Sequence, residues 1–131
     1  MSLDHHPNAF LALIGLTLVR WEPGVAEFEL LIDHRHTNRQ GVLQGGALAT
    51  MLDAACGYAG LHDGTGNADG QAVTLSLMVN YLVRVDGGRL RAVGTVTGGG
   101  RRIFFSNGAV LAADGTVVAT AQGSFKRMAP R

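Results

Sequence analysis

The sequence predicts an α+β fold in which one long helix packs against a five- to six-stranded antiparallel sheet. Three observations lead to this fold class. An apolar stretch at residues 41–60 has helical periodicity, the chain beyond residue 70 has the pattern of strands, and glycine-rich turns separate those strands. A chain of 131 residues suits one domain with its own core, so we expect residues 1–131 to form a single domain.

The segment before the long helix is predicted to contain a short helix and two strands. The helix is expected within residues 6–15, with Pro7 near its first turn and Gly15 as its stop. The strands are expected at residues 16–22 and 25–33. The buried face of the second strand is predicted to carry four apolar side chains, Ala26, Phe28, Leu30 and Ile32.

The stretch GVLQGGALATMLDAACGYAG, residues 41–60, is predicted to be a buried helix. Its core face consists of five apolar side chains at helical spacing, Leu48, Met51, Leu52, Ala55 and Ala59. Asp53 lies roughly 140° from Leu48 around the helix axis, and it is the only charged residue between Gln44 and Leu61. A carboxylate in such surroundings is expected to have a specific partner or a raised pKa, both features of functional sites. The alternative is a simple solvated position.

Two glycines, Gly45 and Gly46, stand at the start of this helix, where the first N–H groups have no partner within the helix. Without side chains they leave these donors open to a ligand oxygen that gains negative charge. The alternative is that both glycines only permit close packing against the sheet. The sequence leaves the two interpretations open.

The rest of the chain is predicted to be β, after a polar loop at residues 61–70. Four strands are expected, at residues 72–85, 89–97, 101–112 and 116–127, the last three completing an antiparallel meander. In the first of them, Thr74, Ser76 and Asn80 are predicted to share one face. The other face is predicted to be apolar, with Val73, Leu75, Leu77, Val79, Tyr81, Val83 and Val85.

Composition and charge exclude several classes of function. The formal net charge is only +1, which predicts no strong attraction to nucleic acid or to an anionic membrane. No signal-peptide pattern is present, and the apolar run at residues 10–19 is too short to span a membrane, so we expect a cytoplasmic location. Because only 16% of the residues are charged, we expect part of the surface to lie in a subunit interface. A homodimer that assembles into a homotetramer is the expected state.

Neither histidine nor cysteine chemistry is expected. His34 and His36 alternate in a polar loop without a further Cys or His nearby, so we expect no metal site. Cys56 is the only cysteine, which excludes an intrachain disulfide. It has no basic neighbour to lower its pKa, so we expect it to pack in or beside the core and not to act as a nucleophile.

The segment HTNRQGVLQGGALATMLDAACGYA resembles the signature of the PaaI-like, hotdog-fold acyl-CoA thioesterases. That signature runs Asn, two residues, Gly, two residues, His-Gly-Gly, and then an acid on the helix. The matching positions here are Asn38, Gly41, Gly45, Gly46 and Asp53. Similarity continues through the long strand and the closing strands, from about Leu16 to Lys126. The sequence departs from the pattern at Gln44, which replaces the usual His, and near Arg84, where a Pro is common.

The resemblance implies a hotdog fold, with the sheet wrapped around the helix and two protomers paired edge to edge. It implies an active site at the dimer interface, where the Gly45 N–H binds the thioester carbonyl and Asp53 acts as general base or nucleophile. Asn38 would position the carbonyl or a water molecule, and Thr74 would hold the water or the acid.

Substrate contacts are also implied. Gln44 and Gly46 are expected to line the substrate site, and Arg101 and Arg102 to bind the phosphates of coenzyme A, with an ordinary solvated turn as the alternative. Coenzyme A is then part of the substrate, and no cofactor is expected. Aryl-acetyl, benzoyl-type and medium-chain acyl groups all remain candidates.

Two other functions remain open. The first is a hotdog protein that binds acyl-CoA or another acyl ligand without hydrolysing it, because Gln44 cannot carry a proton charge. The second is a hotdog dehydratase, whose expected catalytic His is not evident.

Overall fold

The computed structural model describes residues 8–62 and 70–128. The described helices are α1 (Ala9–Ile14) and α2 (Gly45–Ala59), with a short 3-10 helix, η1, at His34–His36. The strands are β1 (Thr17–Glu22), β2 (Val25–Leu31), β3 (Gln71–Tyr81), β4 (Arg89–Gly99), β5 (Ile103–Ala112) and β6 (Val117–Met128). Most of the polar loop expected at residues 61–70 and the expected helix residue Pro7 lie outside the described residues.

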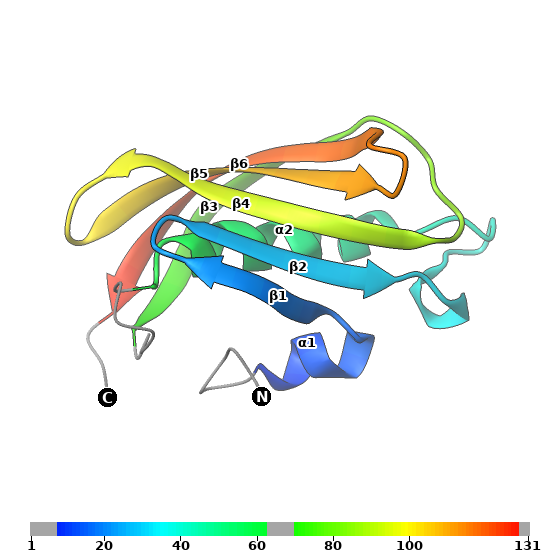
Figure 1. Ribbon diagram of the computed structural model, residues 1–131, viewed down its shortest axis with the longest axis horizontal. Coiled ribbons are helices and arrows are strands. Elements are labelled where there is room, and N and C mark those ends of the chain that lie inside the picture. The colour runs from blue at the N-terminus through cyan, green and yellow to red at the C-terminus, as the bar shows by residue number, and fades with distance from the viewer. Residues whose placement is uncertain (1–7, 63–69, 129–131) are drawn as a thin grey trace.

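One curved antiparallel sheet wraps around α2 (Figure 1). The strand order is β1-β2-β4-β5-β6-β3, so β1 and β3 form the two edges of the sheet. The strands β4, β5 and β6 form the expected meander, whereas β3 pairs with β6 and not with β4, its neighbour in sequence. The α+β class and the hotdog arrangement predicted from the sequence are confirmed.

The core lies between α2 and the concave face of the sheet. All five side chains predicted for the core face of the helix are buried, and so are the four apolar side chains predicted for β2 and its end. The helix contacts the sheet directly at Gly94, where an added Cβ would stand 2.2 Å from the Ala55 carbonyl oxygen. Glycine is therefore required there by the close approach of the two backbones.

The short helix α1 ends where the sequence predicts, and it begins at Ala9, after Asn8. The Asn8 side chain accepts a hydrogen bond from the Leu11 N–H, which caps the first turn. Gly15 ends the helix in the left-handed region at φ 77°, as predicted for a stop. Within the described residues, neither α-helix has the length and hydropathy that a membrane span requires.

Candidate active site

Asp53 is the only acidic or basic side chain of α2. Its Oδ1 accepts a 2.6 Å hydrogen bond from the Thr74 hydroxyl on β3. The sequence predicted that this isolated carboxylate has either a specific partner or a raised pKa. The structure shows a specific partner, the Thr74 hydroxyl. No other donor among the described residues is hydrogen-bonded to this half-buried carboxylate, so Oδ2 keeps its lone pairs for a proton or a ligand.

A β-bulge places Thr74 opposite Asp53. On β6, Phe125 pairs with Thr74 and Ser124 pairs with Ser76, which leaves Leu75 without a partner. One inserted residue reverses the alternation of side chains along a strand. The predicted alternation, which put Thr74 on the same face as Ser76, is therefore wrong at Thr74. Its side chain points to the helix, on the face of the sheet that carries the buried Phe125.

Asp53 and Thr74 border a pocket of about 260 Å³. The pocket follows α2 from Thr50 to Tyr58 and reaches Leu61 just beyond it, with β3 and β6 on one side and α1 on the other. Its lining is mainly apolar and aromatic, with Phe10, Leu11, Ala54, Tyr58, Ala72 and Phe125. Such a lining around a few polar groups is typical of small-molecule sites.

The N-terminus of α2 is open. Gln44 makes no side-chain cap, and within the described residues the N–H groups of Gly45 and Gly46 have no acceptor. A Cβ at Gly45 would meet only the Tyr81 ring, at an ordinary contact distance of 3.4 Å, and one at Gly46 would meet only the Gln44 side chain, at 4.0 Å. Neither glycine has a positive φ. Packing within one protomer therefore does not require either glycine, which argues against the close-packing interpretation.

The loop before α2 is closed by its own hydrogen bonds. The Asn38 Oδ1 accepts from the N–H groups of Gln40 and Val42, at 2.9 and 3.3 Å. This oxygen is therefore used within the loop, and the Asn38 Nδ2 is the group that a ligand could engage. Gln44 is exposed, and its backbone N–H donates to the His36 carbonyl oxygen.

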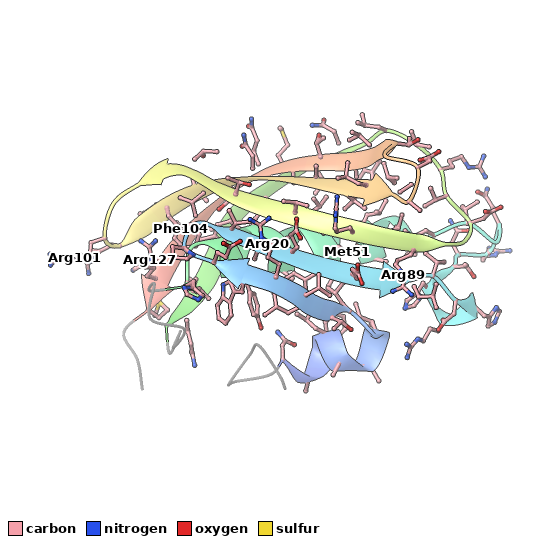
Figure 2. All side chains as sticks on the ribbon, in the orientation of Figure 1. Arg20, Met51, Arg89, Arg101, Phe104 and Arg127 are labelled. Atoms are coloured by element: carbon pink, nitrogen blue, oxygen red, sulfur yellow. The ribbon has the colours of Figure 1, made fainter. Side chains whose placement is uncertain are left out.

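Arg101 and Arg102 lie at the tip of the β4–β5 hairpin, and both are exposed. Figure 2 shows Arg101 projecting away from the sheet at this tip. Neither guanidinium has a hydrogen-bond or ion-pair partner in the described part of the chain. A third cation, Arg127, behaves differently: it donates to the carbonyl oxygens of Gly60 and Gly100, at 3.0 and 2.6 Å, and lies over the Phe104 ring.

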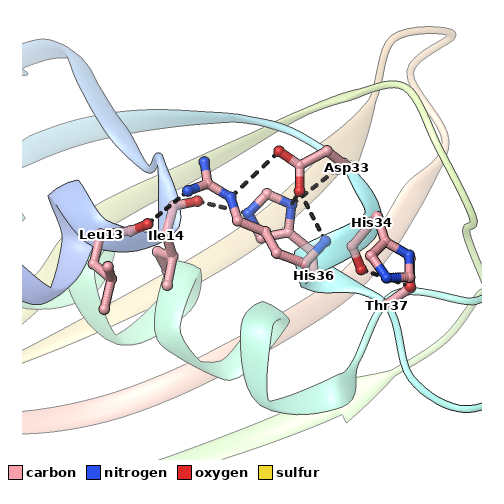
Figure 3. Close-up of polar contacts among 7 residues, drawn as sticks. Leu13, Ile14, Asp33, His34, His36 and Thr37 are labelled. Carbon is pink, nitrogen blue, oxygen red and sulfur yellow. Dashed lines mark hydrogen bonds and ion pairs between the residues drawn. The ribbon is translucent and has the colours of Figure 1, made fainter.

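His36 is a structural residue. It is 5% exposed, its Nε2 lies 2.6 Å from the Ile14 carbonyl oxygen, and its Nδ1 accepts from the Asp33 N–H (Figure 3). Because a carbonyl oxygen only accepts, the proton must reside on Nε2. Both ring nitrogens of His36 are therefore hydrogen-bonded to backbone groups. Among the described residues, we find no group of three or more His, Cys, Asp or Glu side chains that could hold a metal ion.

Cys56 is fully buried on the sheet side of α2. Burial, and then the nearby charge of Asp53, raise the pKa of its thiol to about 12. A thiol with so high a pKa is a poor nucleophile, in agreement with the packing role expected from the sequence.

Three residues near the site were not identified from the sequence, namely Phe10, Tyr81 and Arg127. The first two lie far from Asp53 in sequence, and their place depends on the way β3 and α1 fold onto α2. The role of Arg127, which is half-buried, likewise depends on contacts with distant residues, Gly60 and Gly100.

The chain matches the family model of the thioesterase superfamily over residues 40–119. The comparison with curated proteins gives no significant match.

Solved structures resemble the chain over nearly its whole length. A conserved protein from Pseudomonas aeruginosa is 35% identical, with 93% of this chain and 95% of that chain covered and a TM-score of 0.85. A mutant of the phenylacetic acid degradation protein PaaI from Thermus thermophilus is 26% identical, with 92% and 100% covered and a TM-score of 0.81. A thioesterase family protein from Silicibacter pomeroyi is 26% identical, with 92% and 90% covered and a TM-score of 0.81. The chain therefore belongs to the thioesterase superfamily, in the PaaI-like hotdog type, whose general chemistry is thioester hydrolysis.

Proposed function

We propose that the protein hydrolyses an acyl-CoA thioester, with an aryl or medium-chain acyl group, to the free acid and coenzyme A. The observation that carries this proposal is the Asp53 carboxylate. It is the only charge on an apolar helix, it borders a pocket, and Thr74 holds one of its oxygens at 2.6 Å. A carboxylate fixed in this way can act on a carbonyl carbon bound beside it.

Two routes agree with this geometry. As a base, the free Oδ2 of Asp53 takes a proton from water, the water oxygen bonds to the carbonyl carbon, and the C–S bond breaks as the proton passes to the leaving sulfur. As a nucleophile, Oδ2 bonds to the carbonyl carbon, the thiolate leaves, and water hydrolyses the resulting anhydride. Both routes place negative charge on the carbonyl oxygen, and a backbone N–H can stabilise it. A thiolate is a good leaving group, so neither route calls for a cofactor.

The Gly45 N–H is the proposed donor to that oxygen, and it must come from a second protomer. Gly45 and Asp53 are eight residues apart on one helix, which at a rise of 1.5 Å per residue separates them by about 12 Å along the axis. A single thioester cannot contact both from the same chain. A composite site, with Asp53 from one protomer and Gly45 from its partner, resolves this. Gln44, Gly46 and the free amide of Asn38 would then contact the substrate near that helix N-terminus.

The edge strand β3 supports the proposed homodimer. No charged residue occurs between Gln71 and Val83, and six large apolar side chains are exposed there, Val73, Leu75, Met78, Tyr81, Leu82 and Val83. An exposed apolar edge is a template for pairing with another strand. The outer face of the sheet supports the proposed homotetramer, because a shallow hollow there is lined by Met78, Phe105 and uncharged polar residues.

Arg101 and Arg102 are the proposed ligands of the coenzyme A phosphates. Their guanidinium groups are exposed and unpaired within the described residues, and Arg suits bidentate contacts with phosphate. Replacing either with Ala should raise KM for acyl-CoA more than it lowers kcat. An unchanged KM in both variants would contradict this assignment.

A second candidate function is acyl-ligand binding without hydrolysis, which is favoured by one observation. Gln44, at the usual place of a His, is exposed and makes no cap hydrogen bond, and it has no proton charge to offer. Thiol release from a panel of acyl-CoA substrates separates the two functions.

The Asp53→Asn variant tests the proposal most sharply. The substitution keeps the size and shape of the side chain but removes the basic oxygen, so kcat should fall by about 10²–10⁴. The melting temperature should stay near the wild-type value, and acyl-CoA should still bind. The matched control is Thr74→Ser, which keeps the hydroxyl donor and should keep most of the activity. A folded Asp53→Asn protein that hydrolyses at the wild-type rate would refute the role of Asp53 and favour the binding function or another catalytic centre.

A further inference from the structure

The pocket beside Asp53 has a wall that is formed by α1, outside the sheet. Asn8, Phe10 and Leu11 line this wall, whereas Ala72, Thr74 and Phe125 line the opposite one. Figure 1 shows α1 beside β1, on the open side of the curved sheet. The space next to the carboxylate therefore depends on where α1 lies.

A helix of six residues is not stable alone in water, so α1 must be fixed by its surroundings. Its first turn is capped by Asn8, and its last carbonyls are held from η1 (Figure 3). Arg35 donates from Nη1 to the Leu13 carbonyl oxygen at 2.7 Å, and the His36 Nε2 donates to the Ile14 carbonyl oxygen at 2.6 Å. These contacts fix the position of α1 relative to the loop that leads into α2.

Phe10 is the side chain of α1 that can limit the pocket. It is large and apolar, yet 56% exposed, and it borders the pocket. Leu13, on the same helix, is 68% exposed and does not line the pocket. A ring that is not needed for the core and faces a ligand site is placed to contact the ligand.

We propose that α1 is the specificity wall of the acyl pocket and that Phe10 determines the largest acyl group that the site accepts. The inference rests on the proposed function for the identity of the ligand as an acyl-CoA. An apolar cavity of about 150 Å³ holds one benzene ring. The pocket here, of about 260 Å³, has room for one ring with a short spacer or for a medium-length chain.

The test uses two measurements on the full chain. The first is kcat/KM for phenylacetyl-, butyryl-, octanoyl- and dodecanoyl-CoA. The second is the Kd of the corresponding S-alkyl thioethers of CoA, which cannot be hydrolysed. Phe10→Ala should widen the pocket. Relative to the octanoyl compounds, the kcat/KM for dodecanoyl-CoA and the affinity for the matching thioether should each rise by about tenfold or more. Phe10→Trp should lower the octanoyl values relative to the butyryl ones.

Leu13→Ala is the matched control, because it shortens an apolar side chain of the same helix outside the pocket. It should leave the ranking of chain lengths unchanged. If wild type hydrolyses acyl-CoA but neither Phe10 variant shifts the ranking, or if Leu13→Ala shifts it equally, the inference is wrong and the proposed function stands. If nothing is hydrolysed but Phe10→Ala still moves the size limit for the thioethers, the proposed function fails and the inference stands. Absence of thioether binding in wild type would overturn both.

Discussion

The two ends of α2 are built in opposite ways. At the N-terminus, the N–H groups of Gly45 and Gly46 have no acceptor among the described residues, and Gln44 provides no cap. At the C-terminus, the carbonyl oxygens are used: Trp21 Nε1 donates to Tyr58 at 2.8 Å and Arg127 Nε donates to Gly60 at 3.0 Å.

Glycine occurs at both ends for different reasons. A Cβ at Gly60 would lie 2.2 Å from the Phe104 ring, so packing within the chain requires the absence of a side chain. A Cβ at Gly45 would lie at an ordinary contact distance, so nothing in the protomer requires glycine there. The C-terminal end therefore serves stability, whereas the N-terminal end keeps N–H groups that no described residue of the protomer uses. Substitutions at the two ends should therefore affect different measurements.

Among substitutions at the two ends of α2, the largest effect is expected from Gly45→Pro, in kcat. Pro is tolerated at the first position of a helix, and the extended backbone of Gln44, at ψ 134°, is compatible with a following Pro. The substitution removes the N–H but keeps the helix intact. The kcat should therefore fall by about 10²–10³, with little change in melting temperature. Gly45→Ala keeps the N–H and is the control. Equal kcat values in the two variants would contradict an active role for this N–H.

The next effect is expected from Gly60→Ala, in stability. The added methyl group overlaps the buried Phe104 ring, and overpacking of this kind costs about 1–3 kcal/mol in the free energy of unfolding. The kcat should stay near the wild-type value. Gly46→Ala, with only the Gln44 side chain at 4.0 Å, should instead keep or raise stability. Chemical denaturation measures both, and a larger loss for Gly46→Ala would reverse the comparison.

A smaller loss of stability is expected from Arg127→Lys. A lysine cannot reach both Gly60 and Gly100 with the planar geometry of a guanidinium, and the contact over Phe104 weakens. We expect Arg127→Lys to lower the free energy of unfolding by about 1–2 kcal/mol. Arg89→Lys, which alters an exposed ion pair with Glu29, should change it by less than about 1 kcal/mol. Similar values for both would argue against a structural role of Arg127.

The smallest effect concerns Cys56, which lies on the buried side of α2 that packs against the sheet. Burial, and then Asp53, raise its thiol pKa to about 12, so the thiol stays protonated at pH 8. A thiol reagent at that pH should react only after denaturant unfolds the chain. Rapid labelling of the folded protein would show that this side of α2 opens.

Much of this structure was predictable because its signals are local. Helical and alternating periodicities located α2 and β2, and Gly15 ended α1 as expected. The partner of Asp53 was reached from the family signature, whereas the alternation along β3 pointed Thr74 the wrong way. The bulge at Leu75 decides its direction, and a bulge depends on pairing with β6, which lies far along the chain. The roles of Phe10 and Arg127 likewise arise from long-range packing.

The proposed site combines Asp53 of one protomer with Gly45 of its partner. Mixing Asp53→Asn and Gly45→Pro subunits tests it directly, because each variant alone has no intact site. With random exchange, about one quarter of the sites combine an intact Asp53 with an intact Gly45 from the partner. We predict that equal mixing after co-refolding restores kcat to about one quarter of the wild-type value. Activity that stays at the level of the separate variants, although subunit exchange is verified by mass spectrometry, would contradict the composite site.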